Sequence, residues 1–302
     1  MSVLYTPNSL EKGLKTLFLQ HFASEVSLVN ALAFIERSDS DSESYDWLGQ
    51  VPQMQEFIDE RRTAPLSNTK YTITNKTYEA TLAVNRDDLA DNKTGSVQRR
   101  IQQMALRASA FPNKLTIDAL INATTDLCYD GTAFFGNSHP ARADEGSTQD
   151  NLLAGTGTTV AAFSADLSSA KAAMLGFSDE AGEPFHGDGV VGLTCVVPAG
   201  LEKVAREVLG ASMISNTSNV AHQGMAELIV SPRLSDANDW YLCRTDAAAK
   251  ALIFQDRQPV EFEALEGNSD AGFSRRQYQY GVSARYNVGY GFWQSATKTV
   301  NS

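Results

Sequence analysis

Cysteine is scarce in this sequence, and the cysteines that are present form no recognisable pattern. Cys128, Cys195 and Cys243 are far apart along the chain, and no two of them make a CxxC pair. An odd number of scattered cysteines argues against a disulfide framework, and the missing CxxC spacing argues against the common kinds of zinc site. This usage fits the reducing cytoplasm.

Long apolar runs are also missing. No stretch approaches the roughly 18 to 20 apolar residues that cross a bilayer as a helix. The N-terminus lacks the basic, apolar and small-residue order of a signal peptide. We therefore expect a protein that is not exported by that route, does not span a membrane and has no membrane partner.

Basic residues are outnumbered by acidic ones. The net charge is −11 and the sequence pI is about 4.9. We therefore do not expect the protein's main function to be binding the phosphate backbone of nucleic acids, which requires a basic surface. The 302 residues are 42% hydrophobic and 20% charged, which is enough apolar material for a sizeable core. This length predicts one large or two modest domains.

Catalytic signatures are absent as well. The sequence contains no GxxxxGK[ST], HExxH or GxSxG motif, and the GTG run at 155–157 lacks the third glycine of a dinucleotide loop. One nucleophile candidate stays open: Cys128 lies near Asp130 and His139, as a cysteine hydrolase would require. The other interpretation of Cys128 is a small apolar filler of the core. We predict no catalytic, cofactor-binding or metal-binding residue, and no cofactor.

The strongest local signal is a long helix at 94–124. Its apolar residues recur at steps of four and three and so form one stripe along the helix: Val97, Ile101, Met104, Ala108, Phe111 and Leu115. Such a stripe requires a sheet or another helix against it. Pro112 interrupts the run and predicts a kink or a split at that point.

The segments before this helix are less regular. A weakly amphipathic helix is expected from about 9 to 35, and the acidic, serine-rich tract at 38–44 reads as a flexible joint. Residues 70–74 and 77–84 have strand character, and Asn75-Lys76 occupies the place of a turn. Together, 45–90 are predicted to form an extended hairpin that lies on something else, because an isolated hairpin is marginal in water.

After the long helix, the pattern changes to mixed elements. A loop is expected at 142–159 and a helix at 164–175. The strand and helix signals between about 177 and 250 predict a mixed α/β unit. The remainder of the chain reads entirely as strands, at 251–254, 260–265, 277–285 and 288–293.

Four blocks of sequence resemble a known family. They are YDWLGQVPQM at 45–54, YTITNKTYE at 71–79, CYDGTAFF at 128–135 with SHP at 138–140, and AELIVSPR at 226–233. These blocks are similar to the major head subunit of Mu-like phages and prophages. The resemblance runs over nearly the whole chain.

The resemblance implies an α+β fold like that of the Hong Kong 97 phage capsid protein. Its parts would be an N-terminal arm at 1–44, an extended loop at 45–90, and a peripheral domain at 91–176 that contains the spine helix at 94–124. An axial domain would follow at 177–250, and strands at 251–302 would return to the peripheral domain.

The family implies a structural protein of the virion, not an enzyme. Its copies would form hexamers and pentamers of an icosahedral head that encloses double-stranded DNA without reading its sequence. A scaffold and a portal are expected partners during assembly in the host cytoplasm, and a decoration protein is a further candidate. An encapsulin-like compartment of cellular use has the same fold and remains the alternative.

Candidate intersubunit residues lie in the extended loop. The apolar and aromatic anchor candidates, chosen because Met and aromatic residues are typical of buried interfaces, are Trp47, Met54, Phe57, Tyr71 and Tyr78. The basic candidates for contacts with acidic patches on a neighbour are Arg61, Arg62, Lys70, Lys76 and Arg86. For each basic residue, an exposed loop charge that contributes little is the other interpretation.

Overall fold

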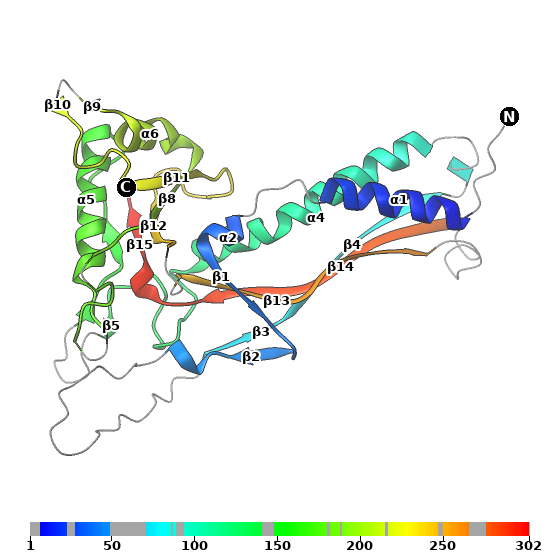
Figure 1. The fold of residues 1–302 in the computed structure, drawn as a ribbon, viewed down its shortest axis with the longest axis horizontal. Coiled ribbons are helices and arrows are strands. Elements are labelled where there is room, and N and C mark those ends of the chain that lie inside the picture. The colour runs from blue at the N-terminus through cyan, green and yellow to red at the C-terminus, as the bar shows by residue number, and fades with distance from the viewer. Residues whose placement is uncertain are drawn as a thin grey trace, which may run out of the picture.

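The computed structural model has two parts that meet at one end of a long sheet (Figure 1). One part is elongated and the other is a compact unit set across it, so that the chain is roughly L-shaped. The structure describes residues 7–22, 28–48, 71–85, 87–88, 94–140, 148–179, 182–187, 189–214, 217–246, 250–265 and 276–301. Helices and sheets are both present, as expected of an α+β fold.

The elongated part is built on a four-stranded sheet, in the order β1-β13-β14-β4. The bounds of these strands are Ala33–Arg37 for β1, Leu252–Leu265 for β13, Gln277–Tyr290 for β14 and Lys76–Asn85 for β4. β1 runs parallel to the first part of β13, whereas β13, β14 and β4 are antiparallel. In β14, alternate residues are buried, as expected of a strand with one covered face.

The two longest strands join runs that the sequence predicted as separate. The predicted strands at 251–254 and 260–265 are one strand, β13, whose pairing with β14 shifts register on both sides of Gln258. Pro259 lies at this irregularity, where a residue without an N–H is tolerated. The predicted strands at 277–285 and 288–293 likewise form a single strand as far as Tyr290.

Helix α4, Thr94–Asn122, confirms the predicted long helix. Of the two effects predicted for Pro112, the split is wrong, because the helix continues through this residue, whereas a kink there stays a prediction. The hydroxyl of Thr116 donates to the carbonyl of Pro112 at 3.0 Å, in the turn that follows the proline. Val97, Ile101 and Ala105 are buried against the sheet.

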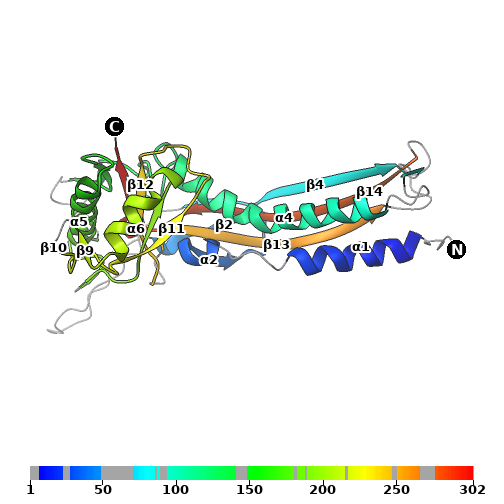
Figure 2. The same cartoon turned by 90° about the horizontal axis from the view of Figure 1, so that it is seen from above.

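Helix α1, Pro7–Phe22, lies along one flank of α4 (Figure 2). Leu14 and Phe18 are buried there, and the ring of Phe18 lies 5.2 Å from that of Phe262 in β13. The arm therefore packs on its own chain through this helix.

The predicted helix from 9 to 35 is too long. A second short helix, α2, spans Leu28–Leu32, and the chain then enters strand β1 at Ala33. Residues 33–37 pair with Leu252 to Asp256 of β13, so strand pairing with a distant segment overrides the local helical pattern.

The predicted hairpin of 70–74 and 77–84 is also wrong. Strand β3, Thr72–Thr74, pairs with β2, Ser42–Ser44, whereas β4 pairs with β14. The two strands thus diverge at Asn75 into different sheets. The sequence shows the alternation of side chains that is typical of strands, but not the partner of each strand. β3 pairs with a strand about thirty residues earlier, and β4 pairs with one more than a hundred residues later.

The acidic tract at 38–44 is ordered rather than a flexible joint. One carboxylate oxygen of Glu43 accepts hydrogen bonds from the Ser38 hydroxyl at 2.9 Å and from the Asp39 amide at 3.0 Å, as well as from the amide and hydroxyl of Ser40. These bonds lower the pKa of Glu43. The tract folds because one of its own acids closes the turn.

The compact part contains a five-stranded sheet in the order β11-β8-β12-β15-β7. Its strands are β7, Leu152–Ala154; β8, Leu193–Val197; β11, Ala226–Val230; β12, Trp240–Arg244; and β15, Ala296–Val300. Its helices are α5, Val160–Gly176, and α6, Glu202–Gly210. The expectation that every strand after 251 returns to the peripheral sheet is wrong for β15, which pairs with β12 and β7.

The remaining elements are short. They are η1, Asp46–Leu48; β5, His139–Pro140; β6, Thr148–Gln149; η2, Ala199–Leu201; β9, Met213–Ile214; β10, Thr217–Ser218; and η3, Trp293–Ser295. One continuous hydrophobic core joins the two parts, from Val29 and Ile117 to Trp240 and Trp293. None of the described helices combines the length and apolarity that crossing a bilayer requires.

Candidate intersubunit surface and the Cys128 cluster

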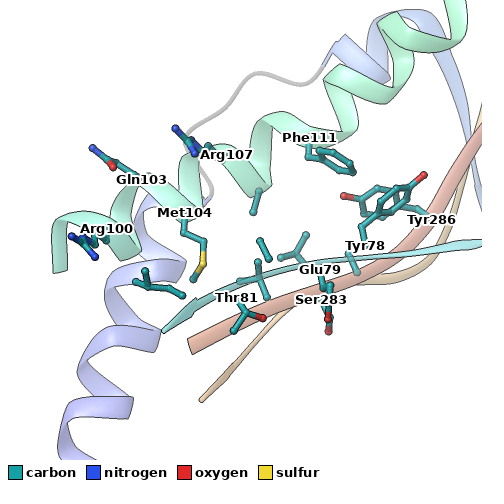
Figure 3. Close-up of a pocket in the computed structure, with 16 residues that line it drawn as sticks. Tyr78, Glu79, Thr81, Arg100, Gln103, Met104, Arg107, Phe111, Ser283 and Tyr286 are labelled. Carbon is teal, nitrogen blue, oxygen red and sulfur yellow. The ribbon is translucent and has the colours of Figure 1, made fainter. Parts of the chain in front are cut away.

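An open groove runs between α4 and the strands β4 and β14 (Figure 3). Its volume is about 440 Å³. The apolar and aromatic side chains that line it come from the helix and from three strands: Tyr78, Ala80, Leu82, Met104, Ala108, Phe111, Val260, Val282, Ala284 and Tyr286. A concave apolar surface of this size that remains open is typical of a binding surface rather than of a finished core.

Three aromatic rings close one end of the groove. The ring of Tyr78 is 4.9 Å from that of Phe111, edge to face, and 5.3 Å from that of Tyr286, nearly parallel. Burial, with a contribution from the charge of Asp118, raises the pKa of Tyr78. Burial also raises the pKa of Tyr286. Both phenols therefore stay neutral at physiological pH, and the cluster presents an uncharged, rigid wall.

The rim of the groove is basic on the helix side. Arg100, Gln103 and Arg107 point away from the sheet (Figure 3), and all three side chains are exposed. Within the described part of the chain, neither arginine forms an ion pair. The arrangement would favour an acidic segment lying along the groove.

Two of the predicted intersubunit residues, Tyr71 and Tyr78, already have partners in their own chain. The hydroxyl of Tyr71 accepts a hydrogen bond from the amide of Tyr290 at 3.0 Å, and its ring packs against the main core. Its pKa is raised to about 12, chiefly by burial. Lys76, in contrast, is exposed at the first position of β4.

The other predicted residues lie outside the described part of the chain. These are Met54, Phe57, Arg61, Arg62, Lys70 and Arg86, together with the side chain of Trp47, so their role stays a prediction. Sequence reasoning missed the groove. Met104 and Phe111 belonged to the predicted apolar stripe, but a stripe does not reveal which of its members a sheet leaves uncovered.

A second cluster surrounds Cys128, a candidate for the nucleophile of a hydrolase. The Cys128 thiol donates to one oxygen of Asp130 at 3.0 Å, and the other oxygen lies 2.6 Å from Nδ1 of His139. Thr132 donates to the same carboxylate through its amide at 2.9 Å and its hydroxyl at 2.7 Å. The His139 ring is buried and stacks on Trp293 at 4.2 Å.

The electrostatics of this cluster oppose nucleophilic chemistry. Burial, the charge of Asp130 and the hydrogen bond to it raise the pKa of the Cys128 thiol, whereas a nucleophilic cysteine requires a lowered pKa. For Asp130, burial acts to raise the pKa, but hydrogen bonds from His139, Cys128 and Thr132 outweigh it and lower the pKa to about 2. The cluster is a buried network around one carboxylate.

The same three side chains are the described residues that could hold a metal ion. Their ligand atoms lie within 4.8 Å of one another. However, both oxygens of Asp130 already accept hydrogen bonds, and Nε2 of His139 lies 3.2 Å from the carbonyl of Phe134. The polar atoms are therefore satisfied by the chain itself.

Comparison with known proteins gives one family match that spans almost the whole chain. A model described as the Mu-like prophage major head subunit gpT matches residues 8–164, 160–234 and 235–301. The major capsid protein of Escherichia phage Mu is 26% identical over 299 residues, which cover 97% of this chain and 74% of the phage protein.

Solved structures show a similar fold. The procapsid of bacteriophage JBD30 gives a TM-score of 0.56 at 25% identity, covering 99% of this chain and 77% of that chain. The holo-SrpI encapsulin complex of Synechococcus elongatus PCC 7942 gives a TM-score of 0.52 at 12% identity, covering 90% and 85% of the two chains. The second likeness concerns the fold alone.

Proposed function

The chain belongs to the family of Mu-like prophage major head subunits, and from this membership we propose that its copies form the hexamers and pentamers of an icosahedral head that encloses double-stranded DNA. Its fold is the Hong Kong 97-like fold of phage capsid proteins. The observation that carries the proposal is that the family match extends over residues 8–301 and that the fold matches that of a phage procapsid protein over 99% of this chain.

Extended contacts between neighbouring copies hold the head together in this proposal. Shell subunits bury far more surface than the roughly 1,600 Å² of a standard protein contact. The loop at 45–90 reaches a neighbour through Trp47, Met54 and Phe57, and its basic residues meet acidic patches there. Tyr71 and Tyr78 pack against other residues of their own subunit. This packing supports a loop whose base is held by one subunit while other residues of the loop contact a neighbour.

The compact part acts as the axial domain at the centre of each hexamer or pentamer. We assign to it the sheet strands β7 and β15 in addition to the segment 177–250, because both strands pair within the same five-stranded sheet. The elongated part, with α4 as its spine, acts as the peripheral domain.

Charge supports a container rather than a nucleic-acid-binding protein. A strongly basic lining would bind packaged DNA along its length and resist its movement, whereas the net charge of this chain is −11. We therefore propose that the DNA is enclosed without sequence-specific contacts. A scaffold and a portal take part during assembly in the host cytoplasm, and a decoration protein is a candidate partner of the finished head.

We propose no catalytic activity. The raised pKa of the Cys128 thiol supports a structural role for that residue, and alkylation of Cys128 no faster than that of a free cysteine is the expected result. An encapsulin-like compartment is the second candidate, supported by the shared fold only. Mass spectrometry of purified shells distinguishes the two, because an encapsulin would contain a protein cargo.

A pair of variants in the extended loop tests the proposed assembly. Met54→Asp should leave the subunit folded, as judged by its circular dichroism, but prevent shells from forming, because a carboxylate would replace an apolar interface anchor. Gln53→Asp is the matched control, since it adds the same charge at the preceding position without removing an anchor. Normal shell yield from Met54→Asp, measured by sedimentation, would contradict the role given to the loop.

A further inference from the structure

His186 lies where the chain passes from the long sheet to the compact one. Strand β14 belongs to the first sheet and β15 to the second, and the residues between them, 291–295, form a crossover that contains η3 (Figure 1). The Nε2 atom of His186 lies 2.8 Å from the backbone carbonyl of Gln294 in this crossover. The ring of the preceding residue, Phe185, lies 5.2 Å from that of Phe292. The segment between α5 and β8 therefore holds the crossover through two adjacent side chains.

Both ring nitrogens of His186 have a partner that fixes their role. A backbone carbonyl only accepts, so Nε2 carries the hydrogen and donates it to Gln294. Nδ1 lies 3.0 Å from Nη1 of Arg244, and a guanidinium only donates, so Nδ1 accepts. The two partners together require a neutral ring in a single tautomer.

The guanidinium of Arg244 is itself held in place. Arg244 ends strand β12, and its Nε donates to a carboxylate oxygen of Asp246 at 2.9 Å. Asp246 packs directly on the backbone of Gly192, where an added Cβ would lie 2.2 Å from the Cβ of Asp246. Because His186 is also buried, the ring and the guanidinium have little freedom to move apart while the site stays closed.

A proton on Nδ1 is incompatible with this closed arrangement. Two donors and two positive charges would then face each other at hydrogen-bond distance. Burial is the largest cause that lowers the pKa of His186, and the charge of Arg244 adds to it. The bond to Gln294 and the charge of Asp246 act in the opposite direction without reversing the shift. The closed site therefore favours the neutral ring, whereas a ring released into water binds a proton below its ordinary pKa of about 6.5.

We propose that His186 is a pH-sensitive latch that fastens the crossover between the two sheets to strand β12. The neutral ring accepts a hydrogen bond from Arg244 and donates one to Gln294. Protonation turns the ring away from Arg244 and breaks its bond to Gln294, so that η3 opens more often at mildly acidic pH. The inference concerns the single subunit and does not depend on how its copies assemble.

Hydrogen exchange of the amides in η3 tests the latch. The amides of Ser295 and Ala296 donate to carbonyls within this turn, so they exchange when it opens. Exchange is measured on the full-length protein at pH 7 and at pH 5, and each rate is divided by the intrinsic rate at that pH. Protection should fall by about tenfold at pH 5, which corresponds to about 1.4 kcal/mol, because the open form binds a proton that the closed form excludes.

Two histidine substitutions make the test specific. His186→Gln is the test variant, because a glutamine side chain can donate and accept but takes up no proton between pH 7 and pH 5. Its protection should be equal at both pH values. His222→Gln is the matched control, since the ring nitrogens of His222 lie 3.2 and 2.7 Å from the hydroxyls of Ser164 and Ser168 on α5 rather than on η3. This variant should keep the tenfold loss of the parent.

The outcome decides the inference in either direction. Equal protection of the parent at both pH values, or a tenfold loss that persists in His186→Gln, would overturn it. An NMR titration of the His186 ring in the parent gives a second result that requires no variant. The ring should titrate below pH 6.5, and a midpoint at or above that value would also overturn the inference.

Discussion

The carboxylate of Asp130 organises the loop between α4 and the compact part. It accepts hydrogen bonds from Cys128, from Thr132 twice and from His139, and its side chain is only 7% exposed. A buried carboxylate keeps its charge only when hydrogen-bond donors of the protein replace the water that it loses. The network holds the turn that carries Phe134 and Phe135 into the main core.

This network predicts a pH dependence of stability. The pKa of Asp130 falls from its usual value of 3.8 to about 2 on folding. A lowered pKa means that its stabilising contribution is fully present above about pH 4 and is lost as the pH falls through 2, a change of roughly 2 kcal/mol. The measurement is the free energy of unfolding of the parent and of Asp130→Asn between pH 5 and pH 2.

The parent should lose its advantage over Asp130→Asn across this interval. The variant has no carboxylate to titrate at this position, so other acids that respond to pH affect both proteins alike. A constant difference between the two from pH 5 to pH 2 would contradict the lowered pKa of Asp130.

The sequence could suggest these residues but not their roles. Cys128, Asp130 and His139 are close in the chain, so their meeting was predictable, and both a catalytic and a structural interpretation were open. What decides between them is burial, and burial here depends on Trp293, which stacks on His139 from more than 150 positions away. No local pattern connects the two.

Helix α1 attaches the N-terminal arm to its own subunit, and the contribution of this packing to the free energy of unfolding can be measured. Phe18 is fully buried against Phe262, whereas the next residue, Leu19, is 53% exposed. Phe18→Ala should destabilise the subunit by about 3 kcal/mol, because it removes a buried ring and leaves a cavity. Leu19→Ala is the matched control and should change stability by no more than about 0.5 kcal/mol.

Chemical denaturation of the unassembled subunit measures both values. A similar small effect of the two substitutions would mean that α1 is detached from its own subunit in solution, contrary to the packing on α4 and β13.

An element whose pattern lies within its own residues could be predicted from the sequence. An element that forms only by pairing with a distant segment could not. The repeat of Val97, Ile101 and Met104 is contained within α4, so the helix could be located to within about two residues. Strand β1 could not, because the preference of residues 33–37 for a strand arises from pairing with β13. The supposed hairpin failed for the same reason, since β3 and β4 each pair with a segment outside it.

At the scale of the whole molecule, two sheets of different orientation share one core. The family resemblance implied both parts, and the periodicity of 94–124 supplied the spine. Neither indicated that β15 crosses from the long sheet into the compact one, because the only sequence signal is a short strand after Trp293. The groove beside β4 is likewise a property of the assembled sheet: it exists because α1 covers one flank of α4 and nothing in the described chain covers the other.

Electron microscopy of the purified protein at near-physiological salt, with sedimentation alongside, shows whether its copies assemble into a shell. We expect closed polyhedral shells, or rings of five and six subunits with the compact part at the centre of each ring. A protein that remains a monomer or dimer at high concentration, even when expressed with a head scaffold, would contradict it.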